Sequence, residues 1–225
     1  MKKIIKTLIV TTAAFTCSFG VIGAEVNIGL INGDFESPSL SPYTYSASDN
    51  FPDEFGWKIA WGQVDLYHDT WQPASGGRQS LDLNGWITGS VYQDFIFPSA
   101  GTWVITFSLS ANPDLYNYGD GLGFGVKEMQ VDFGTPGQMS LLGTYGVDSE
   151  PRRIWDMQWV TITTPEITVS DANTYRLQFS SLVPGAGGAA LDNVQIQLVP
   201  EPSVLALVGS VLIGGLLKRR ASANK

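Results

Sequence analysis

The sequence has a single cysteine among its 225 residues, Cys17, which lies in the apolar stretch near the amino terminus. One cysteine cannot form an intramolecular disulfide or a cysteine metal cluster. Phe15 and Thr16 directly precede it, where a bacterial lipoprotein has small residues, so a lipid anchor is not expected. We therefore expect the fold to depend on an ordinary hydrophobic core, with a metal ion as its one candidate support.

Positive charge is scarce in the central part of the chain. Residues 25–199 contain six basic residues against 20 acidic ones, a formal net charge of −14. Nucleic-acid binding depends on Lys and Arg side chains that neutralise phosphates, so no nucleic acid is expected as a partner. The acidity fits an extracellular protein that meets calcium, and it fits simple solubility equally well.

Histidine is limited to His68, in the segment YHDTW. One histidine cannot build the usual multi-histidine zinc site. A Ser-His-Asp triad remains formally open, but the chain has no G-x-S-x-G motif, so we interpret His68 as a surface or turn residue. With 20 carboxylates, some pair is always available for glycoside hydrolysis, so the number of carboxylates says nothing about whether the protein is an enzyme. We assign no catalytic residue and expect a non-enzymatic protein, with a glycoside-active enzyme as the less favoured alternative.

The amino terminus has the pattern of an export signal. Three lysines lie within the first six residues, an apolar stretch continues to Ile22, and the segment VIGA ends in the small residue Ala24. A basic region, an apolar region and a small residue in this order predict a secretory signal peptide over residues 1–24.

The carboxyl terminus has a second signal over residues 200–225. The residues from 204 to 217 are all apolar or small, and as a helix they would extend about 21 Å, whereas a hydrocarbon core is about 30 Å thick. A basic cluster at the end favours a short transmembrane helix held at the cytoplasmic face. The motif residues are Pro200, Glu201 and Pro202, and the basic residues are Lys218, Arg219 and Arg220.

This order of a Pro-Glu-Pro motif, a short apolar span and a basic end resembles the PEP-CTERM sorting signal of Gram-negative bacteria that make exopolysaccharide. The resemblance implies that an exosortase, a transpeptidase-like membrane enzyme, recognises the tail and cuts it near the motif. It also implies a precursor tethered transiently to the inner membrane and then delivered to the cell surface or the extracellular matrix.

The segment between the two signals, residues 25–199, is long enough for one domain with a sizeable core. Apolar and polar residues alternate in TWVITFSLS (102–110), TYRLQFSS (174–181) and DNVQIQLV (192–199), which is the pattern of half-buried strands. Further short runs are QSLDL, SVYQDFIF, KEMQVDF and WVTITTPEITV, separated by turn residues. Many short strands without long amphipathic helices predict an all-β antiparallel sandwich, or jelly roll.

A series of short motifs extends over most of this domain: NGDFE (32–36), GW (56–57), GQVDL (62–66), SLDLNG (80–85), VYQDF, GTWVITFSLSANP and ALDNVQIQLV. In order and spacing the series is similar to the DUF642 and choice-of-anchor C group of extracellular proteins. The resemblance implies a galactose-binding-domain-like jelly roll, related in shape to carbohydrate-binding modules, in proteins without a known catalytic centre.

The resemblance also implies a structural calcium ion where the start and the end of the domain meet. The family pattern maps onto Glu36 and Asp192 as side-chain ligands, with the carbonyl of Gly33 nearby and Asp34 as an extra ligand. Calcium binds carboxylate and carbonyl oxygens and can join distant chain segments. The alternative is that Asp34 and Asn32 make turn hydrogen bonds and that Asp192 caps a strand turn.

Seven tryptophans are the remaining lead. Trp103 lies on the apolar side of its strand, and Trp57 and Trp159 flank strands, so we expect these three in or against the core. Trp71 and Trp86 lie among turn residues and are predicted to form a carbohydrate platform; the alternative is that they pack beneath their own loops. Supporting contacts are expected from Tyr67, Arg78, Tyr116 and Tyr118. The predicted ligand is an exopolysaccharide or cell-wall glycan, and the rival interpretation is a purely structural surface protein.

Overall fold

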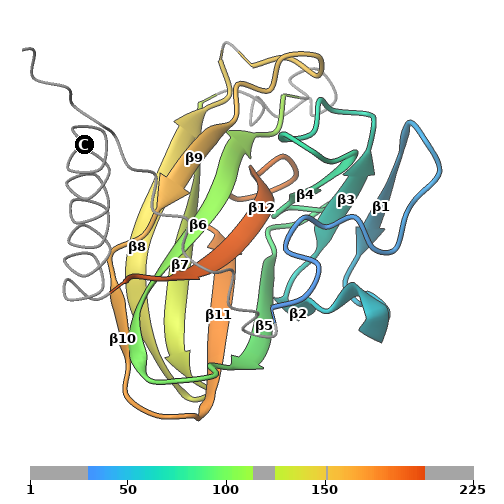
Figure 1. The fold of residues 1–225 in the computed structure, drawn as a ribbon. Coiled ribbons are helices and arrows are strands. Elements are labelled where there is room, and N and C mark those ends of the chain that lie inside the picture. The colour runs from blue at the N-terminus through green and yellow to red at the C-terminus, as the bar shows by residue number, and fades with distance from the viewer. Residues whose placement is uncertain (1–29, 114–124, 151, 201–225) are drawn as a thin grey trace, which may run out of the picture.

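The computed structural model describes residues 30–113, 125–150 and 152–200 (Figure 1). The predicted signal peptide and the predicted sorting tail after Pro200 lie outside the described residues, as do Tyr116 and Tyr118. Nowhere in the described ranges is there a helix long and apolar enough to cross a membrane.

The regular secondary structure of the described residues consists of β-strands and one 3₁₀ turn, which confirms the predicted all-β class. The elements are β1 (Thr44–Ser48), η1 (Asp53–Phe55, a single 3₁₀ turn), β2 (Lys58–Trp61), β3 (Val64–His68), β4 (Gln79–Asp82), β5 (Ser90–Ile96), β6 (Gly101–Ala111), β7 (Val126–Thr135), β8 (Gln138–Asp148), β9 (Val160–Thr163), β10 (Ile167–Val169), β11 (Thr174–Ser181) and β12 (Ala189–Leu198).

The strands form two antiparallel sheets (Figure 1). The first, which we call sheet A, has the order β1-β3-β4-β12-β6-β10, with β9 also paired to β6. The second, sheet B, has the order β2-β5-β11-β7-β8. Neighbours in the sheets are often distant in the chain, so the topology depends on long-range pairing, as is common in antiparallel sandwiches.

The core lies between the sheets and follows the predicted alternation. Along β6, the buried residues include Trp103, Ile105 and Phe107, and their neighbours in sequence are more exposed. Phe107 of sheet A contacts Phe179 of sheet B with ring centroids 5.3 Å apart, close to perpendicular. Trp57 is also buried and lies 5.8 Å from Phe179. The strand faces predicted from the sequence are therefore the faces that meet in the core.

Strand β8 is the long element that the sequence pattern did not predict. Gln138–Asp148 pairs with β7 at the edge of sheet B and is largely exposed or half-buried. Its alternation is weakened by Gly143 and Gly146 and by an exposed Leu141. An edge strand with little buried surface lacks the period-two hydrophobic signal that identified the central strands.

The outer face of sheet A is partly covered by loops. Tyr67 on β3 and Ala190 on β12 form a second buried cluster with Trp71, from the segment after β3, and Met157, from the segment before β9. Tyr67 and Ala190 of this face lie on the same strands as Asp65 of β3 and Asp192 of β12, which are described below.

Candidate functional site

The start and the end of the domain meet at a backbone contact. The amide of Val194 donates a hydrogen bond to the carbonyl of Gly33 over 2.7 Å. A Cβ on Gly33 would lie 2.2 Å from the carbonyl oxygen of Val194, so the contact requires glycine. The pairing of β12 with β6 shifts register between Asp192 and Gln195, and such a bulge redirects side chains where it occurs.

Two carboxylates at this junction hold the loop that precedes β4. Glu36 Oε1 accepts hydrogen bonds from the amides of Arg78 and Gln79, over 2.6 and 2.8 Å. Asp192 Oδ2 accepts one from the amide of Ala74 over 3.1 Å. The structure therefore brings Gly33, Glu36 and Asp192 to one place, as the motif resemblance implied.

The junction carries more negative than positive charge. Burial is the main reason that the pKa of Asp192 rises to about 7, and the charges of Glu36 and Asp34 raise it further. A polar depression of about 320 Å³ adjoins it, lined by Asn32, Gly33, Asp34, Asn193, Val194 and Gln195.

The donor set at the junction fits a calcium ion only if backbone or amide oxygens take part. No group of three Asp, Glu, His or Cys side chains in the described ranges is arranged to hold a metal ion. Calcium does accept carbonyl oxygens and waters besides carboxylates. The alternative roles expected for Asn32 and Asp34 are present as well, because the amide of Ser37 donates to Asn32 and that of Glu36 donates to Asp34.

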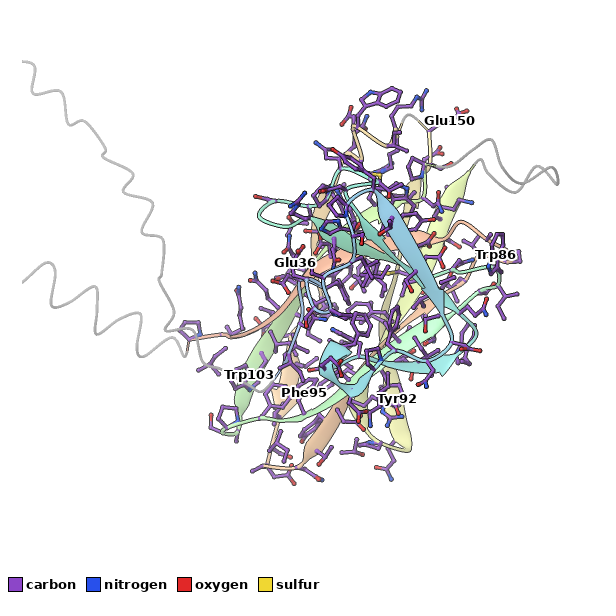
Figure 2. All side chains as sticks on the ribbon, turned by 90° about the vertical axis from the view of Figure 1, so that its right-hand side faces the viewer. Glu36, Trp86, Tyr92, Phe95, Trp103 and Glu150 are labelled. Carbon is purple, nitrogen blue, oxygen red and sulfur yellow. The ribbon has the colours of Figure 1, made fainter. Side chains whose placement is uncertain are left out.

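Trp86 lies at the tip of a tightly held turn between β4 and β5. The amide of Gly85 donates to the carbonyl of Gln63 over 2.8 Å, and Asn84 pairs with Thr88 in an isolated β-bridge. The Thr88 hydroxyl donates to the carbonyl of Val183 over 2.8 Å. The turn is thus closed by its own bridge and bonded to two other segments, yet 64% of Trp86 is exposed, and Figure 2 shows it at the edge of the domain, well away from Glu36.

Other exposed apolar residues occur on the segments that adjoin this turn. Trp61 pairs in register with Ser90, and the amide of Ser181 donates to the carbonyl of Gly89, so the ends of β2, β5 and β11 meet here. We call the exposed large apolar residues of these segments the Trp86 surface: Trp61, Trp86, Ile87 and Leu182.

Trp71 does not share this surface, and the prediction of a joint platform is wrong. Its indole is 2% exposed and stacks on Tyr67, with ring centroids 3.8 Å apart and planes 15° from parallel. Trp71 follows the last residue of β3, whereas the Trp86 turn is hydrogen-bonded to Gln63, which precedes the first residue of β3. The five residues of β3 span about 17 Å, so the two tryptophans lie toward opposite ends of this strand. The alternative, that the indole packs beneath its own loop, is correct for Trp71.

The supporting residues expected around that platform have other roles. Tyr67 is buried against Trp71. Arg78 has an exposed side chain that pairs with Asp69 through two guanidinium nitrogens. This ion pair holds the pKa of the Asp69 carboxyl below its usual range. Arg78 thus closes the loop after β3 and does not reach the Trp86 surface by any contact in the described residues.

Sequence reasoning missed an exposed indole at Trp155. Arg153 and Asp156 exchange two backbone hydrogen bonds of 3.0 and 2.9 Å, which leaves Ile154 and Trp155 at the tip of a two-residue turn. Trp155 is 71% exposed. The sequence signal was the same as for Trp86, an aromatic residue beside an isoleucine between polar residues.

The interpretation of His68 as a surface or turn residue is also wrong. His68 is the last residue of β3 and is 3% exposed. Its Nδ1 atom has no hydrogen-bond partner and lies 3.8 Å from Asp69 Oδ2. By strand alternation its side chain lies on the same face of β3 as Val64 and Leu66, which belong to the core between the sheets.

A buried acidic pair is a further feature that the sequence did not predict. Asp65 on β3 and Asp82 on β4 are direct register partners on the outer face of sheet A. Asp82 is fully buried and Asp65 is 6% exposed. Each is flanked by apolar residues, in VDL and LDL, and a carboxylate in the middle of an apolar strand was the available signal.

Comparison with solved structures identifies proteins of similar fold at low sequence identity. A Stig cyclase, FisC from Fischerella sp. TAU, has a TM-score of 0.50 and 15% identity, over 77% of this chain and 97% of that one. The CBM22-1 xylan-binding domain of Paenibacillus barcinonensis Xyn10C has a TM-score of 0.42 and 14% identity, over 72% and 96%.

A carbohydrate-binding module of Cellvibrio mixtus lichenase 5A, solved with cellotriose, has a TM-score of 0.38 and 15% identity, over 71% and 100%. No family model matches this sequence, and no curated protein matches it. At these identities the comparison concerns the β-sandwich fold alone.

Proposed function

We propose that this domain binds a neutral polysaccharide without catalysing a reaction, and that the Trp86 surface makes the contact. The observation that carries the proposal is the exposure of Trp86 at the tip of a turn fixed by hydrogen bonds to Gln63 and Val183. An indole held in place offers a large contact area at a small cost in conformational entropy. Exposed apolar patches on a soluble domain are typical of interaction sites.

The negative net charge of the domain favours a neutral polysaccharide over an anionic one. With 20 acidic against six basic residues in 25–199, the surface repels polyanions. Two arginines, Arg78 and Arg176, form ion pairs with carboxylates in the described ranges, to Asp69 and Asp94. A neutral chain whose sugar rings stack on aromatic faces fits this surface better than a uronic-acid polymer.

We further propose that a calcium ion stabilises the junction, held by Glu36 and Asp192 with backbone carbonyls such as that of Gly33. Support comes from the buried Asp192 carboxyl, whose pKa is raised by burial and by the charges of Glu36 and Asp34. A cation would offset this excess of negative charge. It would join the two ends of the domain to the loop before β4 and would hold this loop in a fixed position.

The route to the surface remains the one that the terminal sequences indicate. We propose that the signal peptide exports the chain and that an exosortase acts on Pro200, Glu201 and Pro202 in the PEP-CTERM-like tail. Replacing these three residues with alanine should leave uncleaved precursor in the inner membrane fraction, as seen by immunoblotting. Processing of the triple variant at the normal rate would refute this assignment.

The rival is a structural surface protein that has no defined glycan. It is favoured by the burial of Trp71, which removes one of the two aromatic residues expected to bind. The exposure of Trp86 favours binding, because an isolated structural domain gains nothing from a fixed, solvent-facing indole. The two functions therefore differ in whether the Trp86 surface has a ligand.

The test compares two exposed tryptophans in the full chain. Trp86→Ala should lower the retention of the protein on insoluble neutral polysaccharides, such as cellulose and xylan, at least tenfold, while its melting temperature stays within a few degrees. Trp155→Ala is the matched control, because Trp155 has similar exposure and lies on a turn that contacts Gln72, after β3. Equal retention of wild type and Trp86→Ala, or no retention of wild type, would favour the structural protein.

A further inference from the structure

The acidic pair on the outer face of sheet A has an arrangement that antiparallel strands normally avoid. Asp65 and Asp82 lie directly opposite one another on β3 and β4, so their side chains point to the same face. Opposed residues on neighbouring strands have Cβ atoms about 4.5–5.5 Å apart, and like charges in such a pair are destabilising. Because both residues are almost completely buried, water does not screen them.

Two buried oxygen atoms at this pair have no hydrogen-bond partner among the described residues. Asp65 Oδ1 is buried and accepts no hydrogen bond, and the same holds for Oδ1 of the fully buried Asn84. Asn84 Oδ1 and Asp82 Oδ1 lie 2.2 and 2.9 Å from the point that a Cβ on Gly188 would occupy. Both oxygens therefore pack against the backbone of Gly188, in the position that a side chain at residue 188 would occupy.

A second glycine lies beside Asp65. A Cβ on Gly85 would lie 2.8 Å from Gln63 Cβ and 3.2 Å from Asp65 Oδ1, so this close approach requires glycine. Ala190, the register partner of Asp82 on β12, contributes only a methyl group to the same face. Small residues thus border the acidic pair on the strand and on the turn.

No cation of the described residues compensates the pair. The ion pairs found in the described ranges involve Asp69 and Asp94, and none includes Asp65 or Asp82. Burial raises the pKa of Asp82 to about 7, with a further contribution from the charge of Asp65. Burial likewise raises the pKa of Asp65 to about 6. The two opposed carboxyls therefore have no positively charged side chain paired with them in the described ranges.

A proton shared by Asp65 and Asp82 would be the simplest way to reduce the negative charge of the pair. It would leave more of the polar atoms here without a partner than a bound cation would. Asp82 accepts N–H hydrogen bonds from Asn84 and Gly188 at Oδ1 and from Asn112 at Oδ2, and such donors favour its ionised form. A proton between Asp65 and Asp82 would also leave Asn84 Oδ1 without a partner. A cation with water ligands can serve all three side chains.

We infer that Asp65, Asp82 and Asn84 hold a hard divalent cation such as Ca²⁺, with waters completing its shell. Carboxylate, amide and water oxygens are the ligands that Ca²⁺ and Mg²⁺ prefer. This site is separate from the junction at Glu36 and Asp192, because it lies on β3, β4 and the turn after β4. It does not depend on the proposed function: it would tie the base of the Trp86 turn to sheet A whether or not a glycan binds.

The experiment counts bound cations in the full chain. After treatment with chelator and its removal at pH 8, calorimetric titration with Ca²⁺ alone and then Mg²⁺ alone gives the stoichiometry for wild type, Asp65→Asn and Asp192→Asn. Asp65→Asn should bind one cation fewer than wild type, because Asp65 Oδ1 has no other partner in the fold. Asp192→Asn should keep the cation at Asp65 whether or not it loses one at the junction.

A second variant guards against loss of folding. Asp82→Asn removes the other carboxylate, and near-ultraviolet circular dichroism reports whether each variant retains its packed aromatic residues. One folded variant with a reduced stoichiometry supports the site. The inference is overturned if wild type binds no divalent cation, if a folded Asp65→Asn or Asp82→Asn variant keeps the wild-type number, or if the only cation is lost in Asp192→Asn.

Discussion

The segment around Trp71 and the turn around Trp86 have similar local sequences, but Trp71 is buried and Trp86 is exposed. Both place a tryptophan among small and turn-forming residues that include Gly, Asp, Ser and Thr, next to strands of sheet A. Trp71 is buried on Tyr67, under a segment whose Met157 amide donates to the side chain of Gln72 over 2.9 Å. Trp86 is fixed as firmly by its own turn, but no described segment covers it.

This difference shows that turn composition indicates where a chain reverses and does not indicate whether the reversal is covered. Gln72 and Met157 are 85 residues apart in sequence, so the cover over Trp71 comes from a distant part of the chain. An indole beneath such a cover contributes to stability, whereas an indole at an uncovered, rigid tip is available for binding. The two tryptophans can be separated by experiment.

The largest expected effect is on stability at the covered tryptophan. Trp71→Ala should lower the free energy of unfolding by about 3–5 kcal/mol, because it leaves a cavity beside Tyr67. Trp86→Ala should change it by no more than about 0.5 kcal/mol, since an exposed side chain away from special features contributes little. Urea unfolding followed by circular dichroism measures both values. Equal losses in the two variants would abolish the distinction between the two regions.

The next effect concerns how the covered loop is held. Glu36→Ala should destabilise the domain by about 1–3 kcal/mol, because two backbone amides lose their acceptor. Glu36→Gln retains an acceptor oxygen and should behave like wild type in the presence of chelator. If calcium occupies the junction, adding calcium should stabilise wild type more than either variant, because neither variant can supply the carboxylate. Melting curves with calcium and with chelator provide the comparison.

A third effect is the dependence of stability on pH in chelator. The pKa of Asp192 is about 7 in the folded chain, above the ordinary value of 3.8, so the folded state binds this proton more tightly than the unfolded state. Its contribution is complete below about pH 4 and is lost as pH rises through about 7. Asp82 and Asp65 act in the same direction.

The melting temperature should therefore fall between pH 5 and pH 8, and Asp192→Asn should reduce the fall. The Trp86 turn has no titratable side chain of its own between residues 84 and 89, so Trp86→Ala should leave the pH profile unchanged. A melting temperature that rises over this range would contradict the direction assigned to all three carboxyls.

Much of the fold could be predicted from the chain, and less of the site. The strands at residues 102–110 and 174–181 and the inward orientation of Trp103, Phe107 and Phe179 followed from alternation alone, because side chains on a strand point to opposite faces with a period of two. Strand β8 lacked this signal at its exposed edge. The meeting of Glu36 with Asp192 followed from a motif resemblance and not from any local pattern.

By itself, the sequence determined the all-β class, the faces of the central strands and the acidic charge of the domain, since each depends on residue types and on the backbone period. Tertiary structure decided which tryptophan is covered and which carboxylates oppose each other. The register between β3 and β4 places Asp65 against Asp82, and the segment before β9 buries Trp71. Both depend on contacts between segments distant in the chain, which a local pattern does not encode.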